Sequence, residues 1–265
     1  MFSVLDMFTI GVGPSSSHTV GPMCAAQAFA SSLEESGAVS RVGRIRVVLY
    51  GSLSLTGLGH GTDRAILAGL EGNVPATVDT DYLLSVRERC AHDGTIHVNG
   101  TNAIAYDDDG DMVFDRWKRL APHPNGMRFQ AFDAQGNIID EQVWYSIGGG
   151  FIRRGRIDDA LISNHEQTPA SSQSPEDSGN DEAAEYGDGV PYPFVSCDGL
   201  IDLCRKHHLS IADVVWANET ARRSPQEVRD RLTRIWNVMS HCIDAGCASA
   251  TPTLPGGLDV PRRAP

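Results

Sequence analysis

The sequence is poor in positive charge. Its 265 residues carry 22 lysines and arginines against 34 aspartates and glutamates, a formal net charge of -12. Binding to nucleic acid or to an anionic membrane surface needs clustered lysine and arginine, so this balance argues against both partners. The sequence also lacks an apolar run of membrane-spanning length and the basic and apolar regions of a signal peptide. We therefore expect a soluble cytoplasmic protein.

Closely spaced cysteine pairs are also missing. The six cysteines form no Cys-x-x-Cys pair; they are Cys24, Cys90, Cys197, Cys204, Cys242 and Cys247. Motifs that bind metal clusters place cysteines about two to four residues apart on loops, so that several thiolates converge. The last four cysteines instead lie in segments with a helical pattern. We expect them to be small buried hydrophobic residues.

The segment from Gly11 to Thr19 holds the densest group of chemically useful side chains. It reads Gly-Val-Gly-Pro-Ser-Ser-Ser-His-Thr, and a helical pattern follows it to about residue 35. Glycine lets the backbone approach a ligand and serine is a favoured N-cap, so one of Ser15, Ser16 and Ser17 should open the helix. The unpaired amides of its first turn attract a carboxylate or a phosphate. The alternative is a capped helix start with a surface histidine, His18.

Six glycine-, proline- or histidine-containing blocks occur along the chain. They span residues Gly13 to Met23, Tyr50 to Asp63, His123 to Phe129, Tyr145 to Phe151, Pro191 to Phe194 and Leu254 to Leu258. In this order they resemble the signature blocks of the iron-sulfur L-serine dehydratases, also called L-serine ammonia-lyases. The resemblance implies elimination of water from L-serine, which gives aminoacrylate and then pyruvate and ammonia.

The resemblance further implies a [4Fe-4S] cluster, one iron of which binds the substrate and helps its hydroxyl group leave. In that family the cluster cysteines lie in a large C-terminal domain, downstream of Pro265. We therefore expect no metal ligands in this chain. The missing cluster domain would be supplied in cis by a longer product or by a second polypeptide, and we also expect a homo-oligomer.

The blocks contain the candidate catalytic and binding residues. His18 and His60 are the candidate proton carriers, because an imidazole titrates near neutral pH. The alternative for each is a structural histidine bonded to a loop carbonyl. The candidate substrate-binding residues are Ser15, Ser16, Ser17, Thr19, Asn125, Gly148 and Gly149. The two glycines follow a strand pattern, and they could equally form a bulge that bends the strand.

Two folded regions and a connector are predicted from the hydrophobic pattern. Residues 1–162 combine helical patterns with strand patterns at 45–50, 95–98 and 103–106 and a hairpin pattern over 126–147. This combination predicts a two-layer α+β domain of helices on an antiparallel or mixed sheet, the beta-type domain of the family. Residues 51–61 should be a loop, and Thr62 or Asp63 should cap the next helix.

The rest of the chain differs in composition. Residues 163–190 hold seven acidic residues and no lysine or arginine, which predicts a disordered acidic linker. Residues 191–265 contain three helical patterns, which start near Ser196, Ser210 and Ser224. By the resemblance, they are the incomplete start of the alpha-type cluster domain.

Two classes of function follow from the sequence. The first is the substrate-side half of an L-serine dehydratase, which needs the cluster domain for turnover. The second is a non-catalytic module that binds L-serine or another small carboxylate and serves regulation or assembly.

Overall fold

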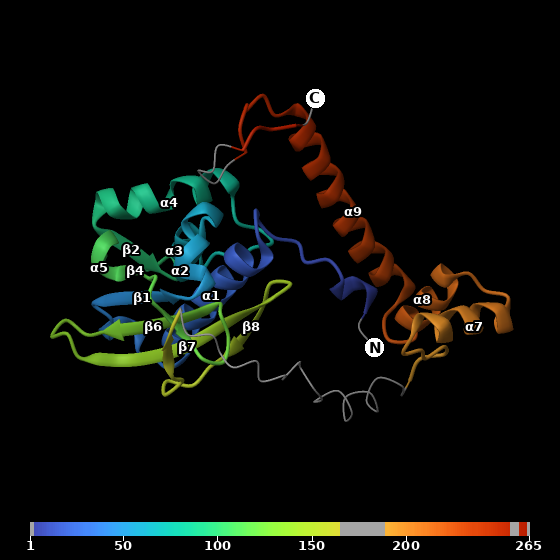
Figure 1. The fold of residues 1–265 in the computed structure, drawn as a ribbon, viewed down its shortest axis with the longest axis horizontal. Coiled ribbons are helices and arrows are strands. Elements are labelled where there is room, and N and C mark those ends of the chain that lie inside the picture. Colours follow the sequence, from blue (N-terminus) through green and yellow to red (C-terminus); the bar gives the residue numbers. More distant parts are fainter. Residues whose placement is uncertain (1–2, 165–188, 255–259, 264–265) are drawn as a thin grey trace. The chain divides into compact units, whose positions relative to one another are not determined.

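The computed structural model describes residues 3–164, 189–254 and 260–263, which fall into two compact units (Figure 1). The larger unit contains the described residues of 10–164 and 251–263, and the smaller contains those of 3–9 and 189–250. Most of the expected acidic linker, residues 165–188, lies outside the described residues.

The described part of the larger unit is built on a seven-stranded sheet. Its order is β2-β3-β1-β6-β7-β8, and β4 also pairs with β1. The strands are β1 (Arg44–Tyr50), β2 (Thr95–Val98), β3 (Asn102–Ala105), β4 (Met112–Asp115), β6 (Gly126–Phe132), β7 (Ile138–Gly148) and β8 (Phe151–Arg154). β1 runs parallel to β3 and β4 and antiparallel to β6, so the sheet is mixed. A separate pair joins β5 (Lys118–Leu120) to β9 (Leu161–Ser163).

Helices cover one face of this sheet. The longer ones are α1 (Gly21–Glu35), α3 (Thr62–Leu70) and α4 (Thr80–Asp93). The remaining ones are η2 (Ser16–Val20), η3 (Val39–Arg41), α2 (Ser52–Thr56), η4 (Leu58–His60) and α5 (Asp108–Asp111). Alternate residues of β1, Ile45, Val47 and Leu49, join the helices in one buried core, where the Phe29 and Phe129 rings stack 5.3 Å apart. The predicted α+β fold is confirmed.

The segment between Gly51 and Gly61 is not the expected loop. It contains α2 and η4, and Gly61 rather than Thr62 or Asp63 is the N-cap of α3. Gly51 and Gly61 have φ values of 57° and 63°, which glycine adopts at low cost and which allow the chain to turn sharply at both ends. The Thr62 and Asp63 side chains are thereby released for contacts with other elements.

The smaller unit is helical, as expected. It contains η1 (Val4–Asp6), α7 (Cys197–His207), α8 (Ile211–Thr220) and α9 (Pro225–Ala248). Ser196, Ser210 and Ser224 cap α7, α8 and α9 through their side chains, so each helix starts where its pattern was expected to start. Glu219 of α8 is buried and accepts hydrogen bonds of 2.8 Å from both the Ser3 hydroxyl and the Val4 amide.

The expectation of buried cysteines in this unit is wrong. Cys197, Cys242 and Cys247 are exposed and Cys204 is half-buried. The cause is the small core of the unit. The structure describes α7 and α9 over their whole length; α7 has no buried residue, and α9 has only Val228. No helix among the described residues is both long and apolar enough to cross a membrane.

Candidate functional site

A single π-helical turn, η2, leads the chain into α1. Ser15 is its N-cap, and its hydroxyl accepts a 3.1 Å hydrogen bond from the His18 amide, so one of the three serines does open the helix. Within the described part of the chain, the Ser16 and Ser17 amides have no hydrogen-bond partner. Unpaired amides at a helix start are suited to an anion, and π turns recur at functional sites. Ser16 is also exposed.

His18 lies between two hydroxyl groups. Its Nδ1 is 2.9 Å from the Ser17 Oγ, and its Nε2 is 3.0 Å from the Ser52 Oγ at the start of α2. Burial, and secondarily the charge of His60, lower the pKa of His18 below its ordinary value. The ring is therefore neutral at pH 7, with one nitrogen donating and the other accepting. These partners are hydroxyls rather than the loop carbonyl of the structural alternative.

His60 has a different arrangement. Its Nδ1 lies 2.9 Å from the Thr56 carbonyl oxygen, and a carbonyl can only accept, so Nδ1 carries the proton. In the neutral ring Nε2 then has a free lone pair, and it has no partner within the described part of the chain. Nδ1 therefore makes the backbone-carbonyl bond of the structural alternative, while Nε2 can still accept a proton. The His18 and His60 rings lie 4.9 Å apart.

Two buried threonines connect the segments that carry these histidines. The Thr19 hydroxyl donates to the His60 carbonyl oxygen at 2.9 Å, and the Thr62 hydroxyl donates to the His18 carbonyl oxygen at 2.5 Å. Their exposed fractions are 1% and 0%. The Thr19 oxygen also accepts from the Ser15 amide at 3.3 Å. This hydroxyl therefore makes its contacts inside the protein.

A cavity of about 300 Å³ lies beside His60. Its lining includes Gly13, Pro14, Thr19, His60 and Arg64, together with apolar side chains of Leu58, Leu83 and Leu84. It therefore joins the glycine-proline segment before η2 to the histidine of η4. Thr19 and His60 are the candidate site residues that line it.

Asn125 is tied to the start of α1 through Ser146. The Asn125 side chain donates to the Ser146 carbonyl at 3.2 Å, and the Ser146 amide donates to the Asn125 carbonyl at 3.0 Å. The Ser146 side chain packs so closely against Gly21 that a Cβ there would lie 2.1 Å from the Ser146 Oγ. That buried Oγ has no hydrogen-bond partner in the described part of the chain.

Residues 123–126, which include Asn125, also contact α2. The Ser52 amide donates to the Pro124 carbonyl at 2.9 Å, and the Ser52 hydroxyl contacts His18. The Asn125 amide donates to His123 Nδ1 at 3.0 Å. Residues 123–126 are therefore anchored both to the partner of His18 and to the start of α1.

The glycine run at the end of β7 forms a tight turn. Gly148, Gly149 and Gly150 have φ values of 96°, 61° and 84°, and the β7–β8 register shifts between Ser146 and Gly148. This irregularity agrees with the bulge alternative considered from the sequence. Gly148 and Gly149 lie on this turn, beginning two residues after Ser146.

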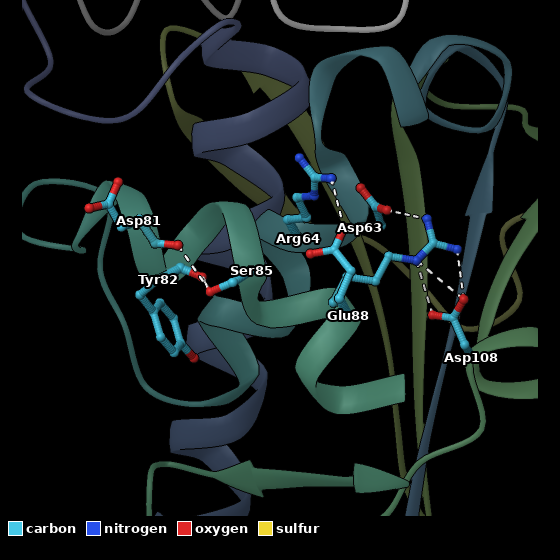
Figure 2. Close-up of polar contacts among 8 residues, drawn as sticks. Asp63, Arg64, Asp81, Tyr82, Ser85, Glu88 and Asp108 are labelled. Atoms are coloured by element: carbon cyan, nitrogen blue, oxygen red, sulfur yellow. Dashed lines mark hydrogen bonds and ion pairs between the residues drawn. The ribbon is translucent and has the colours of Figure 1, made fainter. Parts of the chain in front are cut away.

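Paired charges fasten the start of α3 to α4, and Figure 2 shows their residues Asp63, Arg64 and Glu88. Arg87 of α4 pairs with the buried Asp63 carboxylate and, at 2.8 Å, with Asp108. The hydrogen bond from Arg87 is the main reason that the pKa of Asp108 is lowered. Arg64 and Glu88 form a more exposed pair at 3.3 Å. Asp63 directly follows Thr62, so the start of α3 is held by both residues.

Sequence reasoning missed three residues of this site. Ser52, Thr62 and Ser146 belong to the recognised blocks, but single hydroxyl residues have no periodicity that reveals a tertiary partner. The only available signal was their place in those blocks. In the part of the chain that the structure describes, no three His, Cys, Asp or Glu side chains are grouped so that they could hold a metal ion.

Comparison with known proteins supports one assignment throughout. The family described as "Serine dehydratase beta chain" matches residues 3–156. L-serine dehydratase of Streptomyces coelicolor is 42% identical over 262 residues, which are 99% of this chain and 53% of that protein. L-serine dehydratase 1 of Escherichia coli is 39% identical over 268 residues, which cover 100% and 53%. The chain therefore spans about half the length of the curated relatives it matches.

Proposed function

We propose that this chain, which belongs to the serine dehydratase family, supplies the substrate-side half of an L-serine dehydratase, a carbon-nitrogen lyase. The observation that carries the proposal is the pair of imidazoles 4.9 Å apart, one of which has an unshared Nε2, beside a helix start with unpaired amides. A carboxylate-bearing substrate that loses a proton needs these two functions side by side.

The start of η2 would hold the carboxylate of L-serine. The Ser16 and Ser17 amides and the serine hydroxyls at positions 15, 16 and 17 are all hydrogen-bond donors, and the helix dipole adds favourable charge. Asn125 is proposed as a second binding residue because it is connected to α1 through Ser146. The backbone of Gly148 and Gly149 is proposed to approach the substrate from the β7–β8 turn.

His60 is the proposed proton acceptor. Its Nδ1 proton is fixed by the Thr56 carbonyl, so its Nε2 lone pair can take the proton from the α-carbon of the substrate. His18 would remain neutral and pass or share a proton with the Ser17 and Ser52 hydroxyls that it contacts. His60 is thus favoured over His18, whose two ring nitrogens both have partners.

Among the described residues, no three side chains converge as ligands of an iron-sulfur group, and the exposed Cys197 and Cys242 belong to different helices. The ligands of such a group are therefore proposed to come from a separate domain. The cytoplasmic location and the homo-oligomeric state also remain proposals.

The partner proposed for this chain is the part of its relatives that it does not cover, either in cis or as a separate polypeptide. Leu232, Trp236, Met239 and Ile243 lie on one side of α9, with 36%, 61%, 40% and 58% of their surfaces exposed. Charged or polar residues, including Asp230, Arg234 and His241, occupy the opposite side. An apolar stripe of this kind normally packs on a protein core. The curated relatives extend to nearly twice the matched length, which supplies such a core.

Calorimetry with L-serine tests the binding half of the proposal. Replacing Ser16 and Ser17 together by alanine should weaken binding by about 1–3 kcal/mol, the scale of hydrogen bonds to a charged group. Ser36→Ala, at the other end of α1, is the matched control and should leave the affinity unchanged. Equal affinities for all three proteins would contradict the proposed carboxylate site.

Pyruvate formation tests the catalytic half. The chain would be combined, without oxygen and with iron and sulfide, with the second half of the Streptomyces coelicolor relative. Turnover is expected only in the mixture, and His60→Asn should abolish it while L-serine binding persists. Binding without turnover in an iron-loaded mixture would favour the second candidate function, a non-catalytic L-serine or carboxylate module.

A further inference from the structure

The segments that carry the two candidate catalytic histidines are joined by a crossed pair of hydrogen bonds. Thr19 follows His18, but its hydroxyl binds the carbonyl of His60. Thr62 lies two residues after His60, but its hydroxyl binds the carbonyl of His18. Each histidine is therefore held at its own backbone by the threonine beside the other histidine.

The two threonine side chains that make these bonds are buried. Thr19 and Thr62 are 1% and 0% exposed, so each hydroxyl must find its partner inside the protein. The His60 carbonyl lies at the end of the short 3-10 turn η4, where carbonyls lack a donor from their own helix. Thr19 supplies that donor from η2. Losing either hydroxyl would remove the hydrogen bond that joins the carbonyl of one histidine to the segment of the other.

The contacts around the two rings do not replace this connection. His18 is bound by Ser17 from its own turn and by Ser52 from α2, whereas His60 is bound by Thr56. Each ring therefore has its own supports, and the threonines link the two backbones. The charged residues at the start of α3 are already paired, Asp63 with Arg87 and Arg64 with Glu88.

We propose that Thr19 and Thr62 are paired positioning residues that hold His18 and His60 at their working separation. Thr19 then acts through His60 rather than as a substrate ligand, and Thr62 joins the site although sequence reasoning did not include it. The catalytic meaning of the pair rests on the proposed function, whereas the crossed connection rests on the geometry alone. The Asp63–Arg87 pair reinforces it by fixing the residue after Thr62 (Figure 2).

The test compares isosteric and conservative replacements. Thr62→Val and Thr19→Val keep the side-chain shape but remove the hydroxyl, whereas Thr62→Ser and Thr19→Ser restore it. Thr101→Val, at an exposed position between β2 and β3, is the control. The proteins are labelled at histidine, and nuclear magnetic resonance follows the imidazole resonances of His18 and His60 as the pH changes.

In the wild-type chain the two rings should show mutual nuclear Overhauser contacts. Each valine variant should lose these contacts and shift the pKa of His18 toward its ordinary value, since burial and, secondarily, the charge of His60 lower it in the wild type. The serine variants and Thr101→Val should behave as wild type. If one valine variant does not fold, the other, together with its serine counterpart, decides the result. Unchanged ring contacts and titration in a folded valine variant would overturn the proposal.

An activity readout separates positioning from general stability. In the mixture with the second half of the relative, each valine variant should lower kcat about tenfold or more with little change in KM, because misplaced catalytic groups slow the chemical step. A change in KM alone would contradict the positioning role. If no protein in the series binds L-serine, the proposed function fails. The nuclear Overhauser contacts between the rings still test the crossed connection in that case.

Discussion

The two units of the chain use apolar helix faces in opposite ways. In the larger unit, α1 buries Phe29 and Leu33 completely against the sheet. In the smaller unit, α9 is the longest helix described, yet Trp236 and Ile243 are 61% and 58% exposed. Within the described residues, the helices of the larger unit bury their apolar residues against its own sheet, whereas α9 of the smaller unit keeps an apolar stripe exposed. This exposed stripe is the reason that the proposed partner contact is placed on the smaller unit.

Polar side chains differ in a similar way within the larger unit. The buried Asp63 carboxylate and Arg87 form an ion pair at the start of α3, whereas the side-chain partners of His18 are hydroxyls. Hydroxyls can donate or accept as a proton moves, whereas a fixed ion pair resists such a change. The hydroxyls around His18 can therefore follow a change in its protonation, which the ion pair cannot.

Replacing a core residue of the larger unit should have the largest effect. Phe29→Ala removes a completely buried ring that stacks on Phe129, so the free energy of unfolding should fall by about 3–5 kcal/mol. The change in unfolding free energy is measured by urea denaturation. Hydrogen exchange in peptides from residues 10–164 monitors the unfolding of the larger unit. Ile138→Ala, at a position 53% exposed, is the control and should cost less than 1 kcal/mol by the same burial argument. Equal losses would contradict the assignment of the core.

Breaking the charge pair at the start of α3 should come next. Arg87→Met leaves the buried Asp63 carboxylate without its partner and should cost about 3 kcal/mol, at the lower end for buried pairs because Arg87 is partly exposed. Arg64→Met breaks the more exposed pair with Glu88 and should cost under about 1 kcal/mol. The same denaturation experiment applies. A loss for Arg64→Met as large as that for Arg87→Met would show that burial does not set the difference.

The sequence was sufficient for the parts of the fold that depend on local pattern. The strand predicted at 45–50, the hairpin predicted over 126–147 and the helix starts predicted near Ser196, Ser210 and Ser224 each follow from periodicity or from cap chemistry. These features were predicted because neighbouring residues determine them.

What the sequence missed depends on distant partners. Thr62 and Asp63 are good caps by residue type, but the His18 carbonyl and Arg87 bind them instead, and Gly61 takes the cap position. The exposed cysteines likewise lie on helices that bury few of their own residues, which their helical pattern does not reveal. Among the candidate residues, the structure joins five in one hydrogen-bonded group: Ser15, Ser17, His18, Thr19 and His60. Residue type alone does not predict the contacts with His60, because they join segments that are distant in the sequence.

Acid should destabilise the larger unit moderately. Burial lowers the pKa of both His18 and His123, and Arg153 adds to the effect at His123. Below pH 6.5 the unfolded chain therefore binds more protons than the folded one, and stability falls as the pH decreases toward the folded pKa values. The loss is about 1.4 kcal/mol per pH unit for each histidine at most.

Urea midpoints at pH 7.5 and pH 5.5 measure this effect. His123→Gln should flatten the dependence, because it removes one of the two rings whose pKa is lowered while glutamine can still accept a hydrogen bond from the Asn125 amide. His92→Gln, at an exposed position of α4, should leave the dependence as in the wild type. Stability that rises on acidification would contradict the lowered pKa values.

Replacing an apolar residue of α9 should change the stability of the chain least. Trp236→Gln removes a large side chain that is 61% exposed, so we expect a change within about 0.5 kcal/mol. The same substitution should nevertheless prevent association with the second half of the Streptomyces coelicolor relative, because buried tryptophans often dominate interfaces. Arg234→Gln, on the opposite side of the helix, should preserve this association.

Analytical ultracentrifugation of the mixtures distinguishes the outcomes. Loss of self-association alone would assign the stripe to a second copy, and unchanged association would remove it from any interface. A stability loss of several kcal/mol in the isolated chain would instead mean that its own residues cover the stripe, which would end the contrast between the two units.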